Sequence, residues 1–534
     1  MEENREESRE SLQKRDELEH RKDGLKNFLK KRENLLLILL FAFVIILRTY
    51  YFFKLGAQPV WWDEGDYLAI SKVWSLGMET PEWWSHFTGM RPLLLPMIWT
   101  VFFKIGLGEM SLRFFTLLLP SILAIHLTYL LGKDLYNKRI GLMAAFMLSV
   151  YWVFFFYSFR LLTDISSVCL GLLCFYFFWS YYVKKNKSKG LYLAILFGVL
   201  AFATRFPLAL VLITCAAYLI LVKKFDIFKD KTIWKSVGLL ILFLSPYLVY
   251  FVLTKFKLFQ FYFGESAVSI KNPIAWNILP MLGSFVHNIW FMSLVLGILT
   301  LLPILFGFDI FWKQKNKSLN ADVFVVLWLL VHLFFYIVIF RAANDRWLLM
   351  LMPAIFLVAA KGIEAAHKIL KPHSKYLALA ILIILLFGGA YQNYNHAIDL
   401  TESKKESYLE VKQGGLWLKE NTPKDSKIIT SSIVQNQYYS ERQSYDFYTN
   451  DSIWKSCLDL YGALSTNETC QRKTEEAFNK KIKEVGPAYL VVSIFEPTFT
   501  PNWAYTYPQR YNLTAVVAFP KNTNQPTLVV YKFN

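Results

Sequence analysis

Cysteine is scarce in this sequence, and its few positions form no metal-binding spacing. The chain has 534 residues and 5 cysteines. Cys169, Cys174 and Cys215 lie in apolar runs, where a free cysteine usually packs as a small hydrophobic residue. Cys457 and Cys470 lie in a polar C-terminal region, and they could form a disulfide if that region faces an oxidising compartment. A cysteine-based metal site is therefore not predicted.

Several motifs of soluble enzymes are missing as well. The sequence contains no G-x-G-x-x-G segment, no P-loop and no Ser/His/Asp spacing. It also has no evident internal repeat or low-complexity tract, and no apolar region begins early enough for a cleavable signal peptide. These absences exclude the common nucleotide-binding motifs and the usual serine hydrolase pattern.

Apolar residues, in contrast, are abundant. The chain is 55% hydrophobic and 17% aromatic, whereas soluble chains average about 45–50% apolar residues. Its net charge is +18, but the basic residues fall in short clusters between apolar runs, which is the positive-inside pattern of membrane proteins. We therefore predict a polytopic α-helical membrane protein in contact with membrane lipids, and no nucleic-acid partner.

About eleven apolar runs are long enough to cross a hydrocarbon core of about 30 Å. They lie at residues 35–53, 110–132, 140–158, 164–183, 190–204, 206–222, 235–254, 286–307, 321–340, 346–361 and 376–391.

The apolar segment 92–107 decides the predicted topology. If it does not cross the membrane, the lysine clusters between the other runs all face the side of the basic N-terminus. The positive-inside rule then gives about eleven spans, with the N-terminus in the cytoplasm and the C-terminus outside. Segment 92–107 becomes a helix in the outer interface, which its prolines and Lys104 fit.

Composition divides the chain into three parts. Residues 1–33 read as a charged cytoplasmic tail, and residues 34–391 as the transmembrane domain, with a first outer loop at 54–109. Residues 392–534 read as a small extracytoplasmic α/β domain. Its predicted helices and strands lie at 404–420, 428–430, 471–484, 489–494, 512–519 and 527–533.

The stretch from Trp61 to Tyr67 is the first candidate site. It holds Asp63, Glu64 and Asp66 directly after the first predicted span. Charged residues at a membrane boundary are costly unless something uses them. The predicted topology brings further acids and arginines to the same leaflet from separate segments, namely Arg91, Arg160, Asp164, Arg205 and Arg346.

This collection of residues suits a lipid-linked phosphate substrate. Arginine is the side chain best shaped to bind phosphate oxygens in pairs. A carboxylate could take a proton from an attacking hydroxyl, and arginines could stabilise the charge that grows on a phosphate leaving group.

Each residue also has a structural interpretation. Asp63 and Glu64 could favour the start of a helix. Arg160 and Asp164 could form an i,i+4 ion pair. Arg205 and Arg346 could be anchors at the membrane interface, with their charged head groups in water.

The order of these motifs resembles the membrane glycosyltransferases of the GT-C class. A basic tail and one span precede an outer loop that opens on Asp-Glu-x-x-Tyr at 63–67; Arg91-Pro92-Leu93 follows, and then Arg160 with Asp164 at the start of a span. The most similar branch contains the dolichyl-phosphate-mannose protein mannosyltransferases and the lipid A aminoarabinose transferases (families 39 and 83). The resemblance covers most of residues 35–365 and implies a GT-C fold.

The resemblance implies roles for individual residues. Asp63 takes the place of the general base, with Glu64 beside it, and Asp164 that of the second acid. Arg91 takes the place of the basic residue that meets the lipid phosphate. The phosphate-binding set that follows is Arg91, Arg160, Arg205, Arg346 and Tyr67.

The chain also departs from these relatives. Met90 stands where the aminoarabinose transferases have a metal-holding glutamate, and Asp66 where they have an arginine. No cofactor and no metal is therefore predicted; His287 and Glu64 are the candidate ligands if a divalent metal binds. The lumenal β-trefoil insert of the protein mannosyltransferases is absent, so the resemblance does not identify the acceptor as a protein.

We predict an inverting glycosyltransferase at the outer face of the cell membrane, or of the endoplasmic reticulum membrane in a eukaryote. It would move one sugar, mannose or another hexose or pentose, from a polyprenyl- or dolichyl-phosphate donor to a hydroxyl of a protein, glycan or lipid. The alternatives are a transporter or flippase for a lipid-linked sugar and an oligosaccharyltransferase-like enzyme. Transporters often contain two similar halves, and this sequence shows no such internal similarity.

Overall fold

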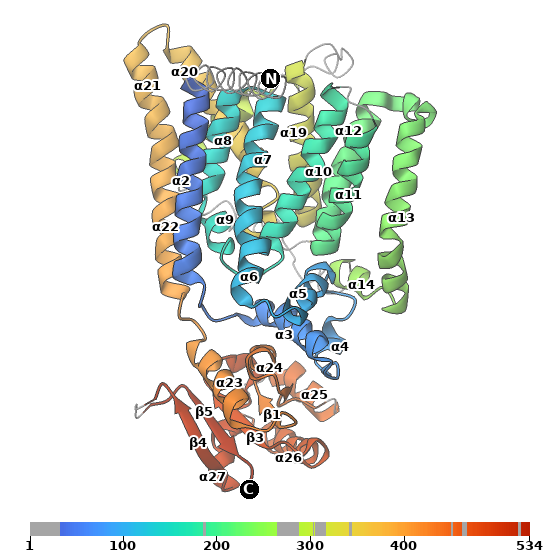
Figure 1. The fold of residues 1–534 in the computed structure, drawn as a ribbon, viewed down its shortest axis with the longest axis vertical. Helices are drawn as coiled ribbons and strands as arrows, with labels where there is room; N and C mark the ends of the chain where they lie inside the picture. The colour runs from blue at the N-terminus through green and yellow to red at the C-terminus, as the bar shows by residue number, and fades with distance from the viewer. Residues whose placement is uncertain are drawn as a thin grey trace, which may run out of the picture.

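The structure is a computed structural model that describes residues 32–184, 188–263, 288–302, 304, 317–340, 344–449, 452–461, 467–521 and 525–534. Most of the predicted tail, the loop after residue 263, and His287 lie outside these residues. The described chain forms a bundle of long helices with an α/β domain at one end (Figure 1).

Long apolar helices form the bundle. Its elements are α2 (Arg32–Leu55), α6 (Glu109–Arg113), η1 (Phe114–Leu118), α7 (Leu119–Leu135), α8 (Lys138–Val150), α9 (Trp152–Tyr157), α10 (Asp164–Lys184), α11 (Lys189–Thr204), η2 (Phe206–Leu208), α12 (Ala209–Lys223), α13 (Lys231–Leu253), α17 (Trp290–Leu299), α19 (Lys317–Phe334), η6 (Phe335–Ile339), η7 (Asp345–Leu348), α20 (Met352–Leu370), α21 (Lys375–Ile383), η8 (Ile384–Gly388) and α22 (Gly389–Lys404). Within the described residues, 7 helices are long and apolar enough to cross a membrane, and three shorter apolar helices accompany them. The membrane-embedded helical fold is thus present, while the total of about eleven spans stays a prediction.

Two predicted helix boundaries differ from the structure. The run predicted at 140–158 is broken at Tyr151, whose extended backbone separates α8 from α9. The last predicted span does not end at residue 391, because its helix continues through α22 to Lys404. The helical rod therefore carries the chain beyond the bundle before the α/β domain begins.

The break at Tyr151 is stabilised by an arginine of the first span. Arg48 is fully buried and donates hydrogen bonds to the carbonyl oxygens of Ser149, at 3.0 Å, and Phe155, at 3.3 Å. Its guanidinium also lies 4.7 Å from the ring centre of Phe155. Arg48 thus satisfies backbone acceptors that an unbroken helix would have paired internally.

Short helices cover the end of the bundle that faces the α/β domain. They are α3 (Trp62–Leu76), α4 (Trp84–Phe87), α5 (Leu94–Lys104) and α14 (Lys257–Phe263). Figure 1 shows them at one end, and the α7–α8, α12–α13 and α20–α21 junctions at the other. Those junctions hold lysines, among them Lys138, Lys229 and Lys371. The segment that decided the topology, 92–107, forms α5, a short apolar helix on α3.

The C-terminal part folds around a sheet with strand order β2-β1-β3-β5-β4. β1 runs parallel to β2 and β3, whereas β5 runs antiparallel to β3 and β4. The elements are α23 (Leu409–Asn421), β1 (Lys427–Thr430), α24 (Ile433–Ser440), β2 (Gln443–Tyr445), α25 (Ser452–Tyr461), α26 (Glu468–Val485), β3 (Tyr489–Ser493), η9 (Pro497–Phe499), η10 (Asn502–Tyr505), α27 (Tyr507–Arg510), β4 (Thr514–Phe519) and β5 (Leu528–Lys532). A disulfide joins Cys457 of α25 to Cys470 of α26.

Alternating side chains give this sheet two apolar faces. Ile429 and Leu490 pack with Phe478 of α26 on one face, whereas Ile428 and Val491 pack with helix α23 on the other. Period-two alternation is what a strand buried on both sides by helices requires. The sequence patterns did not predict β2 and α24, and α24 connects this domain to the bundle.

Helix α24 packs directly on α3. Val434 and Tyr439 belong to the same buried core as the membrane helices. The backbone N–H of Val60 donates to the Tyr439 hydroxyl at 2.9 Å, and Lys72 of α3 pairs with Glu441 at 2.9 Å. The α/β domain therefore fixes the helix that carries the first candidate site.

Candidate active site

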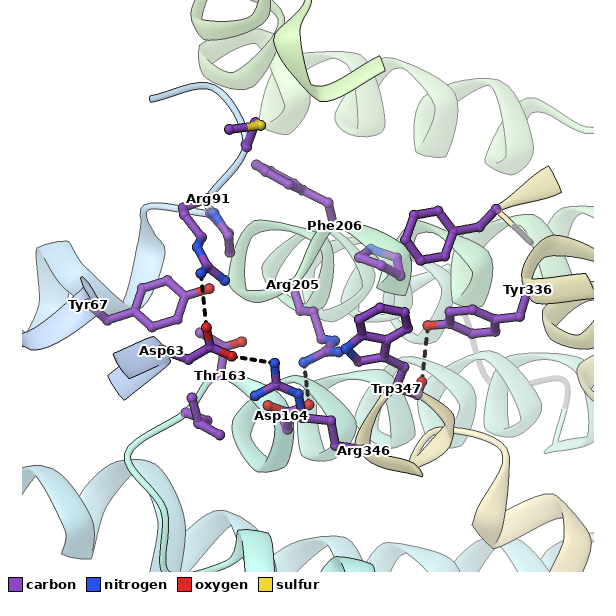
Figure 2. A pocket seen from close by; sticks show the side chains of 15 residues that line it. Asp63, Tyr67, Arg91, Thr163, Asp164, Arg205, Phe206, Tyr336, Arg346 and Trp347 are labelled. Carbon is purple, nitrogen blue, oxygen red and sulfur yellow. Dashed lines mark hydrogen bonds and ion pairs between the residues drawn. The ribbon is translucent and has the colours of Figure 1, made fainter. Parts of the chain in front are cut away.

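One cavity collects side chains from six separate segments of the chain. It has a volume of about 200 Å³ and lies among α3, the loop before α5, the start of α10, η2, η6 and η7 (Figure 2). The polar side chains at its wall are Asp63, Tyr67, Arg91, Thr163, Asp164, Arg205 and Arg346. Six predicted site residues thus meet in one place: Asp63, Tyr67, Arg91, Asp164, Arg205 and Arg346.

Asp63 is held between two arginines. It lies in the first turn of α3, where the helix dipole favours a carboxylate. Arg91 donates to its Oδ1 at 3.1 Å, and Arg346 pairs with its Oδ2. Burial alone would raise the pKa of Asp63, but the charges of Arg346 and Arg91 lower it below the usual value. Asp63 is therefore ionised at neutral pH.

Asp66 lies one helical turn further along α3 and is fully buried. Its Oδ2 accepts a hydrogen bond from Arg91 at 2.7 Å. Burial raises the pKa of Asp66 to about 7, against the lowering effect of Arg91 and with a further raising contribution from Asp63. Asp66 thus supports Arg91 from behind and does not line the cavity.

Asp164 and Arg205 form a second ion pair at the cavity. Asp164 begins α10. Arg205 has an extended backbone between α11 and η2, just before the helix restarts at Phe206. Because both residues lie at helix ends, their side chains project into the space between the helices.

Arg346 enters the cavity from the opposite wall on η7. The Asn344 side chain accepts the backbone N–H of Arg346 and caps this short turn. The hydroxyl of Tyr336 donates to the carbonyl oxygen of Trp347 at 3.0 Å (Figure 2). Burial would lower the pKa of Arg346, but the charges of Asp164 and Asp63 raise it, so it stays protonated.

Apolar side chains complete the wall beside the charged groups. They are Met90, Pro92, Leu162, Phe206, Pro207, Tyr336, Phe340 and Trp347. Sequence reasoning missed these residues as part of the site. The aromatic side chains near Arg346 gave only a weak signal, because such residues are common throughout the membrane helices.

The loop that carries Arg91 is anchored by α13. The backbone N–H of Gly89 donates to the Tyr250 hydroxyl at 2.6 Å. Gly89 has φ of +89°, and a Cβ there would lie 2.7 Å from the Cβ of Thr254. Only glycine fits this left-handed turn so close to the Thr254 side chain, and the turn fixes the position of Arg91.

Glu64 and Arg160 do not line the cavity. They form an ion pair behind it, in which both side chains are fully buried. Glu64 also accepts the backbone N–H groups of Leu161, at 2.5 Å, and Trp61, at 2.6 Å. The Arg160 guanidinium stacks on the Trp61 indole at 3.9 Å from the ring centre. Arg160 thus does not pair with Asp164. It instead connects the first loop to the corner between α9 and α10.

The candidate metal ligands do not come together in the described part of the chain. Both carboxylate oxygens of Glu64 accept hydrogen bonds, and His287 lies outside the described residues. No group of three or more His, Cys, Asp or Glu side chains is arranged for a metal ion among these residues.

The cavity has the chemistry to bind an anion beside an apolar chain. Three arginines and two carboxylates face the cavity. A phosphate that enters can therefore replace a carboxylate as the ion-pair partner of an arginine. The aromatic wall next to them suits an apolar group that enters from the membrane.

A family model for dolichyl-phosphate-mannose-protein mannosyltransferases matches residues 90–250. No curated protein matches the sequence. Solved structures do match over nearly the whole chain. ArnT from Cupriavidus metallidurans, bound to undecaprenyl phosphate, is 12% identical with a TM-score of 0.60, over 92% of this chain and 97% of that one.

Two larger proteins share the fold over part of their length. The oligosaccharyltransferase AglB from Archaeoglobus fulgidus, in complex with an inhibitory peptide and a dolichol-phosphate, is 13% identical with a TM-score of 0.53, over 93% of this chain and 74% of that one. The arabinofuranosyltransferase AftD from Mycobacteria is 12% identical with a TM-score of 0.55, over 92% of this chain and 39% of that one. These matches confirm the predicted resemblance to the GT-C class, and the identities are low enough that they establish the fold alone.

Proposed function

We propose that this GT-C-type chain is an inverting glycosyltransferase that takes a single sugar from a polyprenyl-phosphate or dolichyl-phosphate donor. The acceptor would be a hydroxyl group of a protein, a glycan or a lipid. The observation that carries the proposal is the convergence of Arg91, Arg205 and Arg346 with Asp63 and Asp164 on one cavity. ArnT, which was solved with undecaprenyl phosphate, and AglB, which was solved with a dolichol-phosphate, support a lipid phosphate as the ligand class.

In the proposed reaction, the acceptor oxygen attacks the anomeric carbon of the sugar. The new carbon–oxygen bond forms as the bond from that carbon to the phosphate oxygen breaks. The hydroxyl proton passes to Asp63, and the polyprenyl phosphate leaves with the bonding electron pair. Asp63 suits this role because it is ionised and lies at the cavity wall.

Donor binding would also prepare the base. Arg91 and Arg346 hold Asp63 in the phosphate-free protein. A phosphate that attracts both guanidinium groups weakens their hold on the carboxylate. The pKa of Asp63 then returns toward the ordinary value of an aspartate, and the carboxylate becomes a better base. The same arginines would stabilise the charge that develops on the departing phosphate.

Two further features support a site on the outer side of the membrane. The lysine-bearing junctions lie at the end of the bundle opposite the cavity (Figure 1), as the positive-inside rule expects for a cytoplasmic face. The α/β domain next to the cavity contains a disulfide, which fits an oxidising compartment.

The central test is sugar transfer by the purified full-length protein in lipid nanodiscs. Radiolabelled polyprenyl-phosphate mannose, glucose and arabinose would be combined with a panel of peptide, glycan and lipid acceptors. Asp63→Asn should lower kcat by at least about 10²-fold, as expected for the loss of a general base. Arg346→Met should lower both donor affinity and kcat.

Donor binding by Asp63→Asn separates a chemical role from a binding role. Because this substitution removes the negative charge that competes with phosphate for the two arginines, the variant should bind the lipid phosphate at least as tightly as the unchanged protein does. Full transfer activity in a folded Asp63→Asn protein would contradict the assignment.

A further inference from the structure

A single nitrogen atom of Arg91 serves two carboxylates. Its Nη2 donates to Asp63 at 3.1 Å and to Asp66 at 2.7 Å. One nitrogen of a guanidinium head has two N–H groups, so these two bonds use both of them. A phosphate that approaches Nη2 from the cavity must therefore compete with Asp63, which lies at the cavity wall. Asp66 does not line the cavity and can keep its hydrogen bond from Arg91.

Asp66 differs from Asp63 in its surroundings. Asp63 meets two arginines and is 30% exposed at its side chain, whereas the side chain of Asp66 is fully buried. The Oδ1 atom of Asp66 has no hydrogen-bond partner within the described residues. A proton can bind to this oxygen without breaking the bond from Arg91 to Oδ2.

The charge balance of the cluster depends on that proton. When Asp66 is ionised, the three arginines are matched by three carboxylates, counting Asp63 and Asp164. When Asp66 is neutral, one positive charge is left unmatched next to the cavity. A phosphodiester such as a sugar-phosphate lipid carries one negative charge, which complements the second state.

We propose that Asp66 is a positioning residue that couples phosphate binding at Arg91 to the uptake of one proton from solvent. This inference rests on the proposed function, because it requires an anionic phosphate in the cavity. A phosphate near Arg91 places a second negative charge beside Asp66, and a like charge favours the neutral carboxyl.

The pH range follows from the surroundings of Asp66. Its pKa of about 7 in the phosphate-free protein results from burial and from Asp63, opposed by Arg91. The elements packed on α3 add other titratable groups, but Glu441, which follows α24, is paired with Lys72 and Lys419. None of these three charged groups shifts the pKa of Asp66 appreciably.

The sign of the effect is therefore fixed. Well below pH 7 Asp66 is already neutral, and binding takes up almost no proton. Above pH 7 Asp66 must take up a proton, so the affinity for phosphate falls as the pH rises. If the bound phosphate raises the pKa of Asp66 by about one unit, the affinity should fall by about tenfold between pH 6 and pH 8.5.

The test is calorimetric titration of the full-length protein in nanodiscs with the methyl ester of farnesyl phosphate. This probe is a phosphodiester whose own charge does not change in the range. The unchanged protein should lose about tenfold in affinity between pH 6 and pH 8.5. Asp66→Asn should bind with the same affinity at every pH.

Three variants control for other titrating groups. Asp63→Asn also removes a carboxylate from Arg91. Because Asp63 raises the pKa of Asp66, this variant should move the pH dependence to lower pH without abolishing it. His86→Gln and Asp345→Asn should keep it too; His86 is close to Arg91 in the sequence, and burial raises the pKa of Asp345 beside Arg346.

Proton uptake can also be measured without any substitution. Titrations near pH 7.5 in buffers of different ionisation heat give the number of protons bound with the probe, and we expect a value between zero and one that disappears in Asp66→Asn. Binding without pH dependence or proton uptake would overturn the coupling and leave the phosphate site intact. An absence of binding at every pH would instead remove the phosphate site, and the coupling with it.

Discussion

Neighbouring carboxylates of α3 have different surroundings although they follow one another in the sequence. Asp63 faces the cavity and two arginines. Glu64 points the other way, where Arg160 and two backbone N–H groups use its oxygens. Successive residues of a helix point about 100° apart, so one short motif supplies both a reactive group and a structural one.

This difference predicts opposite outcomes for two similar substitutions. Glu64→Gln should destabilise the protein by about 3–5 kcal/mol, because it leaves the Arg160 charge buried without its counter-ion. Asp63→Asn, at a partly exposed position, should change stability far less while it abolishes transfer. Thermal unfolding in detergent and the transfer assay would measure the two effects.

A double variant tests the same point from the other side. Glu64→Leu combined with Arg160→Met removes both charges and should regain much of the lost melting temperature. A Glu64→Gln protein with an unchanged melting temperature but no activity would instead favour a chemical role for Glu64.

At the scale of elements, the contact between α3 and α24 sets the position of the active-site helix. Gly65 is the point of closest approach: a Cβ there would lie 2.8 Å from the Cγ2 of Val434 and 3.2 Å from the backbone nitrogen of Gln435. Glycine at this position allows two helices from distant parts of the chain to touch near Asp63.

Gly65→Ala should therefore push α24 away from α3. We expect a loss of about 1–3 kcal/mol in stability, as for other overpacked contacts, and a lower kcat because Asp63 shifts with its helix. Adding Val434→Ala should restore part of both quantities, because it removes the atom that the new methyl group meets. Unfolding and transfer assays on the single and double variants measure this.

A glycine elsewhere serves as the control. Gly238 in α13 has no atom within 4 Å of an added Cβ, so Gly238→Ala should leave activity and stability almost unchanged. Equal losses at Gly65 and Gly238 would contradict the packing argument.

At the scale of the whole molecule, the cavity lies at the boundary between the bundle and the α/β domain. The bundle supplies Asp164, Arg205 and Arg346, whereas α24 of the α/β domain holds α3 in place. All the residues that line the cavity precede the α/β domain in the chain, and that domain contributes by holding α3 in position.

This arrangement predicts which parts of the chain can be reached from outside. In a background with the three free cysteines replaced by serine, Lys424→Cys in the α/β domain should react with a membrane-impermeant maleimide in intact cells. Lys229→Cys, which lies at the α12–α13 junction and is mostly exposed, should react only after the membrane is opened. Labelling of Lys229→Cys in intact cells would contradict the proposed topology.

The sequence alone determined the membrane-spanning class and the set of charged residues from which the site is built. Apolar runs and lysine clusters follow directly from the cost of placing charge in lipid, so they can be read without a fold. The resemblance to the GT-C class came from the order of the motifs along the chain, from Asp63–Tyr67 through Arg91-Pro92-Leu93 to Arg160 and Asp164. In the C-terminal domain, sequence patterns predicted the helices α23 and α26 and all described strands except β2, whereas α24 and α25 were not predicted.

Only the tertiary structure decided how these charges are divided. Which arginine pairs with which carboxylate depends on distances between segments far apart in the chain, and no local pattern encodes them. The fold paired Arg160 with Glu64 and Arg205 with Asp164, and it placed Asp66 behind Arg91. The low polarity of a buried position changes the pKa of a carboxyl group, so the separate roles of Asp63 and Asp66 emerge only once their burial is known.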